Sequence, residues 1–250
     1  MPVNTNTLIH FTDSINTMQL ILMNDFYPRM SLEDYGYILN ENEIGKIALP
    51  MICFCDIPLH LISSHMEEYG HFGIGLKKSW GIENGLNPVL YLKRETYLNE
   101  VIIKINEYLV NLKRQNKSKF EMNLMWNLLA FIKPYEGISH KNGKNKVFYD
   151  EREWRYFPNF FESNNIDANI PLLFEKDFNT IKKDNLNNYL KRFPLKYEPS
   201  DIKYIIVKDE EDIYLMSKII DEIKSDKYTQ KDIQILKTKI ISSNYMLEDF

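Results

Sequence analysis

The chain has 250 residues, of which 44% are hydrophobic and 26% are charged, proportions typical of a globular protein with a substantial core. Its formal net charge of -4 gives no general attraction to nucleic acid or to anionic membranes. No run approaches the ~20 apolar residues that span a bilayer. We therefore expect one cytoplasmic domain over residues 1–250, with neither a membrane segment nor a nucleic-acid partner indicated.

The two cysteines, Cys53 and Cys55, are one residue apart in an apolar run. Side chains two positions apart on a strand share a face, and a disulfide at this spacing would be strained, so buried reduced thiols are predicted. A metal site would have to combine them with nearby histidines, but His60 and His65 are five residues apart and would occupy different faces of a helix. We expect no metal.

The first elements are read from local periodicity. Residues 7–12 are rich in strand formers and alternate weakly, which predicts a first strand with His10 and Thr12 on one face. The apolar stripe that follows predicts a helix from residue 15 to about residue 24.

The next stretch predicts several strands joined by less regular segments. Residues 31–46 are polar and mixed, which predicts a loop able to cross a pocket mouth, and the apolar run 48–55 predicts a strand buried on both faces. A helix should follow from Pro58. Residues 69–76 carry glycines at positions 70, 73 and 75, which predicts a strand with one bare face that another backbone or a flat ligand can approach. Another strand is expected at 87–92.

A helical hairpin is predicted at about 95–132, where two segments carry helical periodicity. The basic turn between them, 113–119, lacks interleaved aromatic residues, so we interpret it as a solvated turn, with phosphate contact as the weaker alternative. Residues 133–147 are interpreted as a loop.

The C-terminal third predicts a short helix at 179–189, a strand at 202–207, an amphipathic helix at 210–223 and a closing strand at 233–236. The acidic run 209–212 lies at the start of the amphipathic helix, where negative charge is favourable for capping.

The most informative stretch is 148–158, which places several charges inside an aromatic run. On a strand, Glu151, Glu153 and Arg155 would share one face. Removing a carboxylate from water costs several kcal/mol, roughly, unless it is paired, so these groups need a cleft or close partners. We interpret Glu153 as the chemical centre, while a structural Glu–Arg pair that fixes the strand remains an open alternative.

Polar side chains from separate predicted strands could converge on one site. A lone histidine such as His10 is more often a hydrogen-bonded core residue than a ligand. The two glutamates of Glu151-x-Glu153 could divide the work of orienting a nucleophile and stabilising positive charge that develops on a sugar. The candidate residues are His10, Thr12, Tyr69, Tyr91, Glu151, Glu153 and Arg155.

Six ordered segments together resemble the AbiGi family of bacterial abortive-infection proteins. The resemblance implies one AbiGi-like domain with a role in phage defence. It also implies the antitoxin side of a two-gene system whose toxin, AbiGii, resembles a nucleotidyltransferase. The segments are residues 9–12, 50–58, 65–70, 73–76, 87–91 and 149–155.

A more distant pattern resembles the ADP-ribosyltransferase fold, in particular the DarT toxins. It implies an α+β fold with a split mixed β-sheet, NAD as the cofactor and transfer of ADP-ribose to a macromolecular acceptor. By this resemblance His10 would hold the nicotinamide ribose and Glu153 would stabilise the oxocarbenium-like ribose. Glu151 would be the first residue of the Glu-x-Glu pair, and Tyr69 or Tyr91 would stack on nicotinamide.

Thr12 and Arg155, which belong to the same set of converging polar side chains, are also expected to contact the bound cofactor. Two features depart from the pattern: no second-strand tyrosine is evident, and the hairpin at 95–132 has no obvious counterpart.

These observations leave three hypotheses of different classes. The first is an NAD-dependent ADP-ribosyltransferase. The second is a non-catalytic antitoxin that blocks a partner toxin through a surface, to which the acidic run 209–212 could contribute. The third, a nucleic-acid sensor, is disfavoured by the net negative charge.

Overall fold

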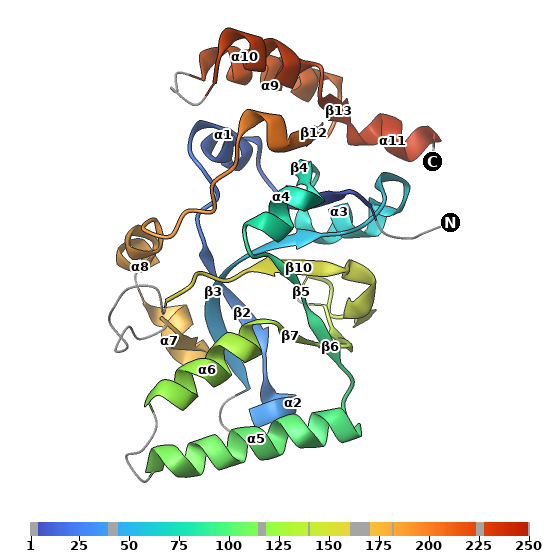
Figure 1. The fold of residues 1–250 in the computed structure, drawn as a ribbon. Coiled ribbons are helices and arrows are strands. Elements are labelled where there is room, and N and C mark those ends of the chain that lie inside the picture. Colours follow the sequence, from blue (N-terminus) through green and yellow to red (C-terminus); the bar gives the residue numbers. More distant parts are fainter. Residues whose placement is uncertain are drawn as a thin grey trace.

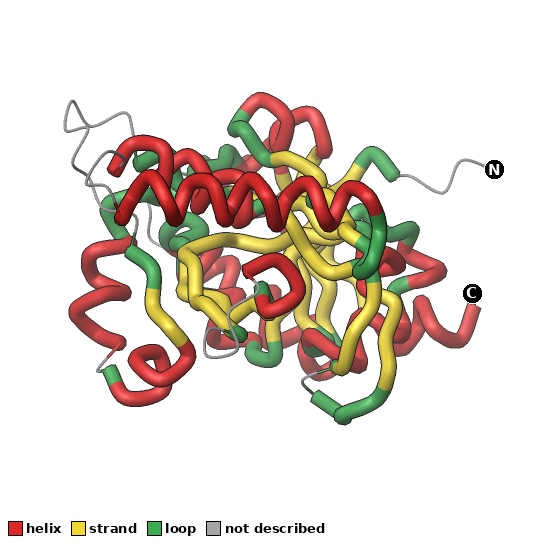
Figure 2. The backbone as a smooth tube through the Cα atoms, turned by 90° about the horizontal axis from the view of Figure 1, so that it is seen from below, coloured by secondary structure: helices red, strands yellow, loops and turns green. Residues whose placement is uncertain are grey.

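The computed structural model describes residues 5–39, 45–114, 119–139, 141–160, 171–181, 183–223 and 228–249 (Figure 1). Within these ranges the chain forms a nine-stranded mixed sheet with the order β13-β12-β4-β1-β3-β10-β5, and β2 and β11 also pair with β3. Helices surround the strands, as the view from below shows (Figure 2). The architecture is therefore α+β, as expected.

The strands of the main sheet are β1 (Thr7–Thr12), β2 (Arg29–Asp34), β3 (Lys46–Cys55), β4 (Phe72–Lys77), β5 (Asn87–Pro88), β10 (Glu153–Tyr156), β11 (Leu173–Phe174), β12 (Ile202–Val207) and β13 (Ile240–Ser242). Two small pairs complete the strands: β6 (Leu90–Leu92) with β7 (Ile132–Pro134), and β8 (Glu136–Ile138) with β9 (Asn145–Val147).

The α-helices are α1 (Ile15–Met23), α2 (Gly36–Leu39), α3 (Ser63–Tyr69), α4 (Lys78–Glu83), α5 (Tyr97–Arg114), α6 (Lys119–Ala130), α7 (Glu175–Thr180), α8 (Lys183–Leu190), α9 (Glu210–Glu222), α10 (Gln230–Lys237) and α11 (Ser243–Asp249). Short 3-10 turns are η1 (Leu59–Leu61), η2 (Phe148–Glu151) and η3 (Pro199–Asp201). Helices α9 and α10 lie at the top of Figure 1 and α5 at the bottom.

Strand β1 and helix α1 form as predicted. Ser14 caps the helix by accepting a hydrogen bond from the Asn16 N–H, and Asn24 ends it. Leu8, Met18 and Leu22 are fully buried in a core shared with α9 and α10. Burying a side chain of this size contributes about 1.5–3 kcal/mol, which fixes β1 against this layer.

Strand β3 pairs with β1, β2, β10 and β11, and it separates from β1 part-way along. Within the described residues, β1 pairs with β3 only at Ile9 and Cys55. On its other edge, β3 pairs with β10 from Cys55, opposite Glu153, to Ile52, opposite Tyr156. The sheet is therefore split between the strand that carries His10 and the strands that follow it.

Two predicted loops contain strands. Residues 31–46 include most of β2, helix α2 and the start of β3, while 40–44 lie outside the described residues. Residues 133–147 include most of β7 and the β8–β9 hairpin. Both predictions were wrong because polar side chains in these strands are half-buried or make ion pairs, so no apolar alternation marks them.

The predicted closing strand at 233–236 is also wrong, because these residues lie in α10. Thr229 and Asp232 form a reciprocal capping box, and Ile233 and Leu236 bury the same helix face. The closing strand is β13, which pairs parallel to β12.

The glycine-rich segment differs from its prediction at both ends. Tyr69 ends α3, and Gly70 follows with φ of +105°, where an added Cβ would lie 2.4 Å from the Thr12 carbonyl oxygen. In β4, side chains rather than a backbone or an open space lie over Gly73 and Gly75, because neighbouring residues of β1 and β12 fill that face. The predicted strand at 87–92 divides into β5 and β6, which belong to different sheets.

The predicted helical hairpin is present as α5 and α6, and residues 115–118 of its basic turn lie outside the described residues. Ile102, Met125 and Leu129 bury one side of the hairpin against α2 and β3 in a second apolar core. No helix in the described part of the chain is long and apolar enough to cross a membrane.

Candidate functional site

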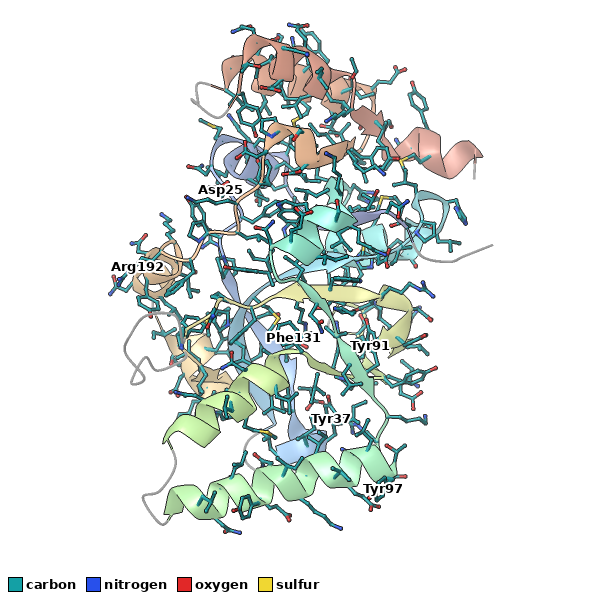
Figure 3. The ribbon with its side chains drawn as sticks, viewed as in Figure 1. Asp25, Tyr37, Tyr91, Tyr97, Phe131 and Arg192 are labelled. Carbon is teal, nitrogen blue, oxygen red and sulfur yellow. The ribbon has the colours of Figure 1, made fainter. Side chains whose placement is uncertain are left out.

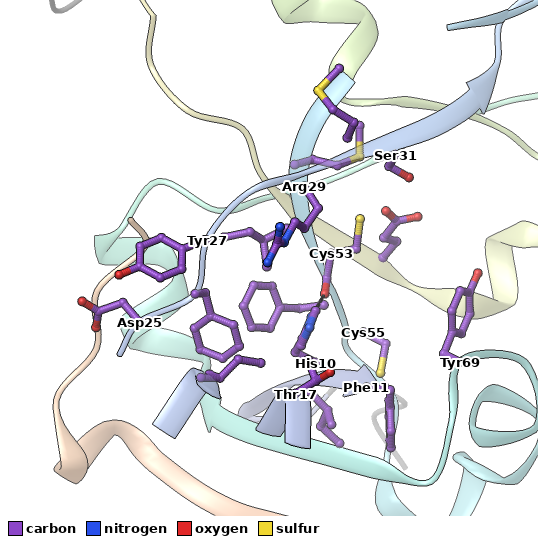
Figure 4. Close-up of a pocket in the computed structure, with 18 of the residues that line it drawn as sticks. His10, Phe11, Thr17, Asp25, Tyr27, Arg29, Ser31, Cys53, Cys55 and Tyr69 are labelled. Carbon is purple, nitrogen blue, oxygen red and sulfur yellow. Dashed lines mark hydrogen bonds between the residues drawn. The ribbon is translucent and has the colours of Figure 1, made fainter. Parts of the chain in front are cut away.

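A cavity of about 660 Å³ lies where β1 and β3 separate (Figure 4). Consecutive residues of both strands, 9–11 and 51–55, line it, so the cavity borders both faces of the split sheet. Helix α1 and residues 24–31 close one side. Both His10 and Glu153 line it, together with Glu151, Tyr69, His65 and Lys133.

His10 enters the cavity from one face of the sheet. Ile9 and Glu153 are both paired to Cys55 and share a face, so the next residue, His10, points to the opposite face. Its ring contacts Phe26 and Phe54 at centroid distances of 5.3 and 5.6 Å. The two candidate residues therefore border one cavity from opposite sides of the sheet.

The His10 imidazole bridges the split. Its Nδ1 lies 2.8 Å from the Cys53 carbonyl oxygen, which can only accept, so Nδ1 carries the proton. Burial lowers the pKa of His10 and outweighs the opposing effect of this hydrogen bond. The ring is therefore neutral at pH 7, and its Nε2 is a hydrogen-bond acceptor.

Glu153 enters from the other face and is held by two cations. Its Oε1 accepts from Arg155 Nε at 2.6 Å, and its Oε2 accepts from Lys133 Nζ at 2.7 Å. Burial opposes ionisation, but Arg155 and Lys133 outweigh it and hold the pKa of Glu153 well below its usual range. The structural Glu–Arg pair is thus present, and the same carboxylate borders the cavity.

Glu151 is not on the strand, contrary to the prediction. It ends η2, and Arg152 follows in the left-handed region with φ of +47° before β10 begins. Its carboxylate nevertheless accepts from Lys133 Nζ at 2.5 Å and from the Tyr69 hydroxyl at 2.7 Å. Burial opposes ionisation, yet Lys133 brings the pKa of Glu151 below its ordinary value.

The ionised groups form a continuous row with alternating sign, which we call the charge chain. It runs from β2 through β10, β7 and η2 to β9 and α3. Arg155 is fully buried and also donates to the Ala130 carbonyl at the end of α6. Its members in order are Glu33, Arg155, Glu153, Lys133, Glu151, Lys146 and Glu68, joined by N–O distances of 2.9, 2.6, 2.7, 2.5, 2.8 and 3.7 Å.

Three predicted cofactor-binding residues do not line the cavity: Thr12, Tyr91 and Arg155. The Tyr91 hydroxyl instead accepts from the Glu153 N–H at 2.8 Å, and Figure 3 shows Tyr91 well separated from Asp25, which lines the cavity. Arg155 acts behind the cavity as the partner of Glu153. Of the two tyrosines, Tyr69 borders the cavity (Figure 4).

Sequence reasoning missed three residues of the site, Lys133, His65 and Glu33. Lys133 was assigned to a loop, although its position between Ile132 and Pro134 after an apolar helix was a usable signal for a buried cation. His65 stacks on Tyr69 at a centroid distance of 4.5 Å and was considered only as a metal ligand.

Both cysteines are free thiols, as predicted, and burial raises the pKa of each. Across the described ranges, no group of three or more histidine, cysteine or acidic side chains is arranged to hold a metal ion.

Comparison with known proteins decides the family. A family model described as abortive phage resistance protein AbiGi, antitoxin, matches residues 24–208. The chain belongs to the AbiGi family. An abortive phage resistance protein AbiGi from Lactococcus lactis subsp. cremoris is 31% identical over 255 residues, which cover 90% of this chain and 99% of the relative. The AbiGi resemblance is thereby confirmed.

No solved structure matches the chain, so no structural relative supports the resemblance to ADP-ribosyltransferases. The AbiGi family match includes the whole charge chain but begins after His10.

Proposed function

We propose that this AbiGi-family protein binds NAD in the cavity between β1 and β3 and transfers ADP-ribose to a macromolecular acceptor during phage defence. The observation that carries the proposal is that neutral His10 and ionised Glu153 border a single cavity. Its volume of about 660 Å³ lies within the range of pockets that hold cofactors.

The lining fits a dinucleotide in composition. Rings of Phe11, Phe26 and Tyr27 give the cavity flat apolar walls, and the two glutamates form a charged end. The His10 Nε2 can accept a hydrogen bond from a ribose hydroxyl, because Nδ1 is already committed to the Cys53 carbonyl. Tyr69, whose hydroxyl is held by Glu151, is the aromatic residue nearest the charged end.

NAD would supply the ADP-ribosyl group and nicotinamide as the leaving group. In that transfer the bond from C1′ of the ribose to nicotinamide would break with the electron pair on nicotinamide, and C1′ would bond to the acceptor, which would lose a proton. The Glu153 carboxylate stabilises positive charge on the ribose because it is fixed and ionised before the reaction. Glu151 orients the acceptor and receives a hydrogen bond from it.

The test is Glu153→Gln, which keeps the size of the side chain and removes its charge. We expect NAD consumption and phage resistance to fall at least about 100-fold, as for the loss of one charge-stabilising group. Glu136→Gln is the matched control, because this exposed glutamate pairs with Lys93 away from the cavity. Full activity of the Glu153 variant in both assays would refute the enzymatic proposal.

A second candidate is an antitoxin that blocks a partner toxin without turnover, and the description of the matching family as an antitoxin favours it. We propose an AbiGii-type toxin as that partner. The acidic run at the start of α9 is one surface for it, although Asp209 already caps the helix by accepting from the Asp212 N–H.

Co-expression separates the two candidates. If Glu153→Gln and His10→Ala both still neutralise the toxin, neutralisation depends on binding. If both variants fold and fail to neutralise, it depends on the cavity.

A further inference from the structure

Lys133 occupies the junction of the charge chain. Its ammonium lies 2.5 Å from Glu151 Oε2 and 2.7 Å from Glu153 Oε2, so one cation separates the two carboxylates. It is buried, and it lines the 660 Å³ cavity and also a second cavity of about 1180 Å³ beside β8 and β9. Arg155, by comparison, reaches only one of the two glutamates and lines neither cavity.

Lys133 lies directly after the α5–α6 hairpin in the chain. Helix α6 ends at Ala130, and β7, which carries Lys133, begins two residues later. The Ala130 carbonyl accepts from Arg155 Nη1 at 2.8 Å, so the end of the same helix also fixes the other partner of Glu153. The partly negative carbonyl end of a helix favours a cation there. Both cations of the site therefore depend on where α6 ends.

We infer that Lys133 is the positioning residue of the site: its charge lets Glu151 and Glu153 remain ionised side by side and fixes both carboxylates at the cavity. The inference rests on the proposed function for its catalytic meaning. Two neighbouring carboxylates without a cation between them repel, and one takes up a proton. Lys133 thus keeps Glu153 available for charge stabilisation and Glu151 available for the acceptor.

Several other charged and titratable groups surround Glu151 and Glu153. Arg155 holds Glu153 from behind, and Lys146 and Tyr69 contact Glu151 but not Glu153. The other titratable neighbours include Glu33 on β2, Tyr35 after it, Glu68 and His65 on α3, Tyr91 on β6 and Cys53 on β3. Lys133 is the one residue in this described set that contacts both carboxylates.

The decisive measurement is the titration of the two carboxyl groups by NMR in protein labelled with ¹³C at the glutamate carboxyls. Signals are assigned by their loss in Glu151→Gln and Glu153→Gln. In Lys133→Gln, which keeps a hydrogen-bond donor without the charge, at least one of the two should titrate about 1–3 pH units higher. Lys133→Arg should restore the original titration. Unchanged titration of both carboxyls in Lys133→Gln would overturn the inference.

Lys146→Met is the matched control, because Lys146 contacts Glu151 and not Glu153. It should move the Glu151 signal and leave Glu153 unchanged. If Lys133→Gln fails to fold, the titration of Glu153 in Lys133→Arg decides: a value close to wild type supports the inference, and a value near that of free glutamate overturns it.

The catalytic consequence is tested by the pH profile of NAD consumption. In Lys133→Gln, kcat/KM should begin to fall with decreasing pH about 1–3 pH units above the point at which it falls in wild type and Lys133→Arg. If wild-type protein neither binds nor consumes NAD, the proposed function fails, and the carboxyl titration still decides the role of Lys133.

Discussion

The two faces of β10 bury their side chains by opposite means. On one face Trp154 and Tyr156 pack against an apolar core that includes Phe54. On the other face Glu153 and Arg155 are buried even more deeply, with Arg155 at 0% exposure. A buried ion pair is seldom better for stability than apolar residues of similar volume. An apolar face would have sufficed for folding. The charged face is therefore best explained by the role of the Glu153 carboxylate and its cation partners at the cavity.

The largest effect should follow from Arg155→Met on the charged face. This change leaves Glu153, Glu33 and the Ala130 carbonyl without a shared donor. Breaking one partner of a buried pair costs about 3–5 kcal/mol in the free energy of unfolding, measured by urea denaturation. Trp154→Phe on the opposite face should cost about 1 kcal/mol. Equal losses from the two variants would remove the distinction between the faces.

The next largest effect should be a pH dependence of the free energy of unfolding that comes from His65. Burial lowers the pKa of His65, beside the charge chain, to about 4. The folded state therefore favours the neutral ring, and its contribution to stability is complete above the unfolded value of about 6.5 and is lost as the pH falls toward 4. His65→Phe keeps a ring over Tyr69 and should flatten this part of the pH profile of the free energy of unfolding. Trp154→Phe should leave the profile unchanged; a His65→Phe profile that still falls between pH 6.5 and 4 by as much as wild type would assign the loss elsewhere.

Tyr69→Phe should have a smaller effect. The change removes one hydrogen bond to Glu151 and keeps the stacking on His65. A hydrogen bond to a charged group contributes about 1.5–3 kcal/mol when buried, and Tyr69 is 37% exposed, so a loss of about 1 kcal/mol is expected. Thermal and urea unfolding measure it, with Tyr214→Phe on exposed α9 as the control. No loss would show that Lys133 and Lys146 satisfy Glu151 without the tyrosine.

The smallest effect is expected for a half-exposed ion pair that does not line the 660 Å³ cavity. Lys46 and Glu175 lie 3.2 Å apart with side chains 35% and 45% exposed. Lys46→Met should change the free energy of unfolding by no more than about 0.5 kcal/mol, because solvent screens such pairs. A loss comparable to that of Arg155→Met would mean that burial does not distinguish the charge chain from surface pairs.

The sequence predicted those parts of the fold in which local periodicity and tertiary burial agree. Strand β1, helix α1, the α5–α6 hairpin, β12 and α9 all carry apolar spacing that matches their buried faces. Strand β2 was not predicted because its polar residue Glu33 is half-buried and pairs with Arg155. That contact joins residues 122 positions apart, so no local pattern indicates it. Segment 233–236 was misassigned because two isoleucines and a leucine mimic strand alternation inside a capped helix.

The site was predicted in part for the same reason. Glu153 could be found because charges inside an aromatic run are costly unless partnered. Lys133, its partner, lies in a short strand whose pairing with β6 is set by long-range packing, and the apolar residues beside it were the one local signal of its burial. The sharing of one cavity by His10 and Glu153 was expected, but their approach from opposite faces depends on the register at Cys55.

The hydrogen bond between His10 and the Cys53 carbonyl bears on how much β1 and β3 must move apart for a ligand to enter the cavity. Beyond Ile9, a side chain rather than a backbone ladder joins β1 to β3 in the described structure. Rotation of the imidazole would break this hydrogen bond, worth about 1 kcal/mol net, together with the ring contacts to Phe26 and Phe54. Strands β1 and β3 could therefore move apart beyond Ile9 while β1 keeps its pairing with β4 and β3 keeps its pairing with β10.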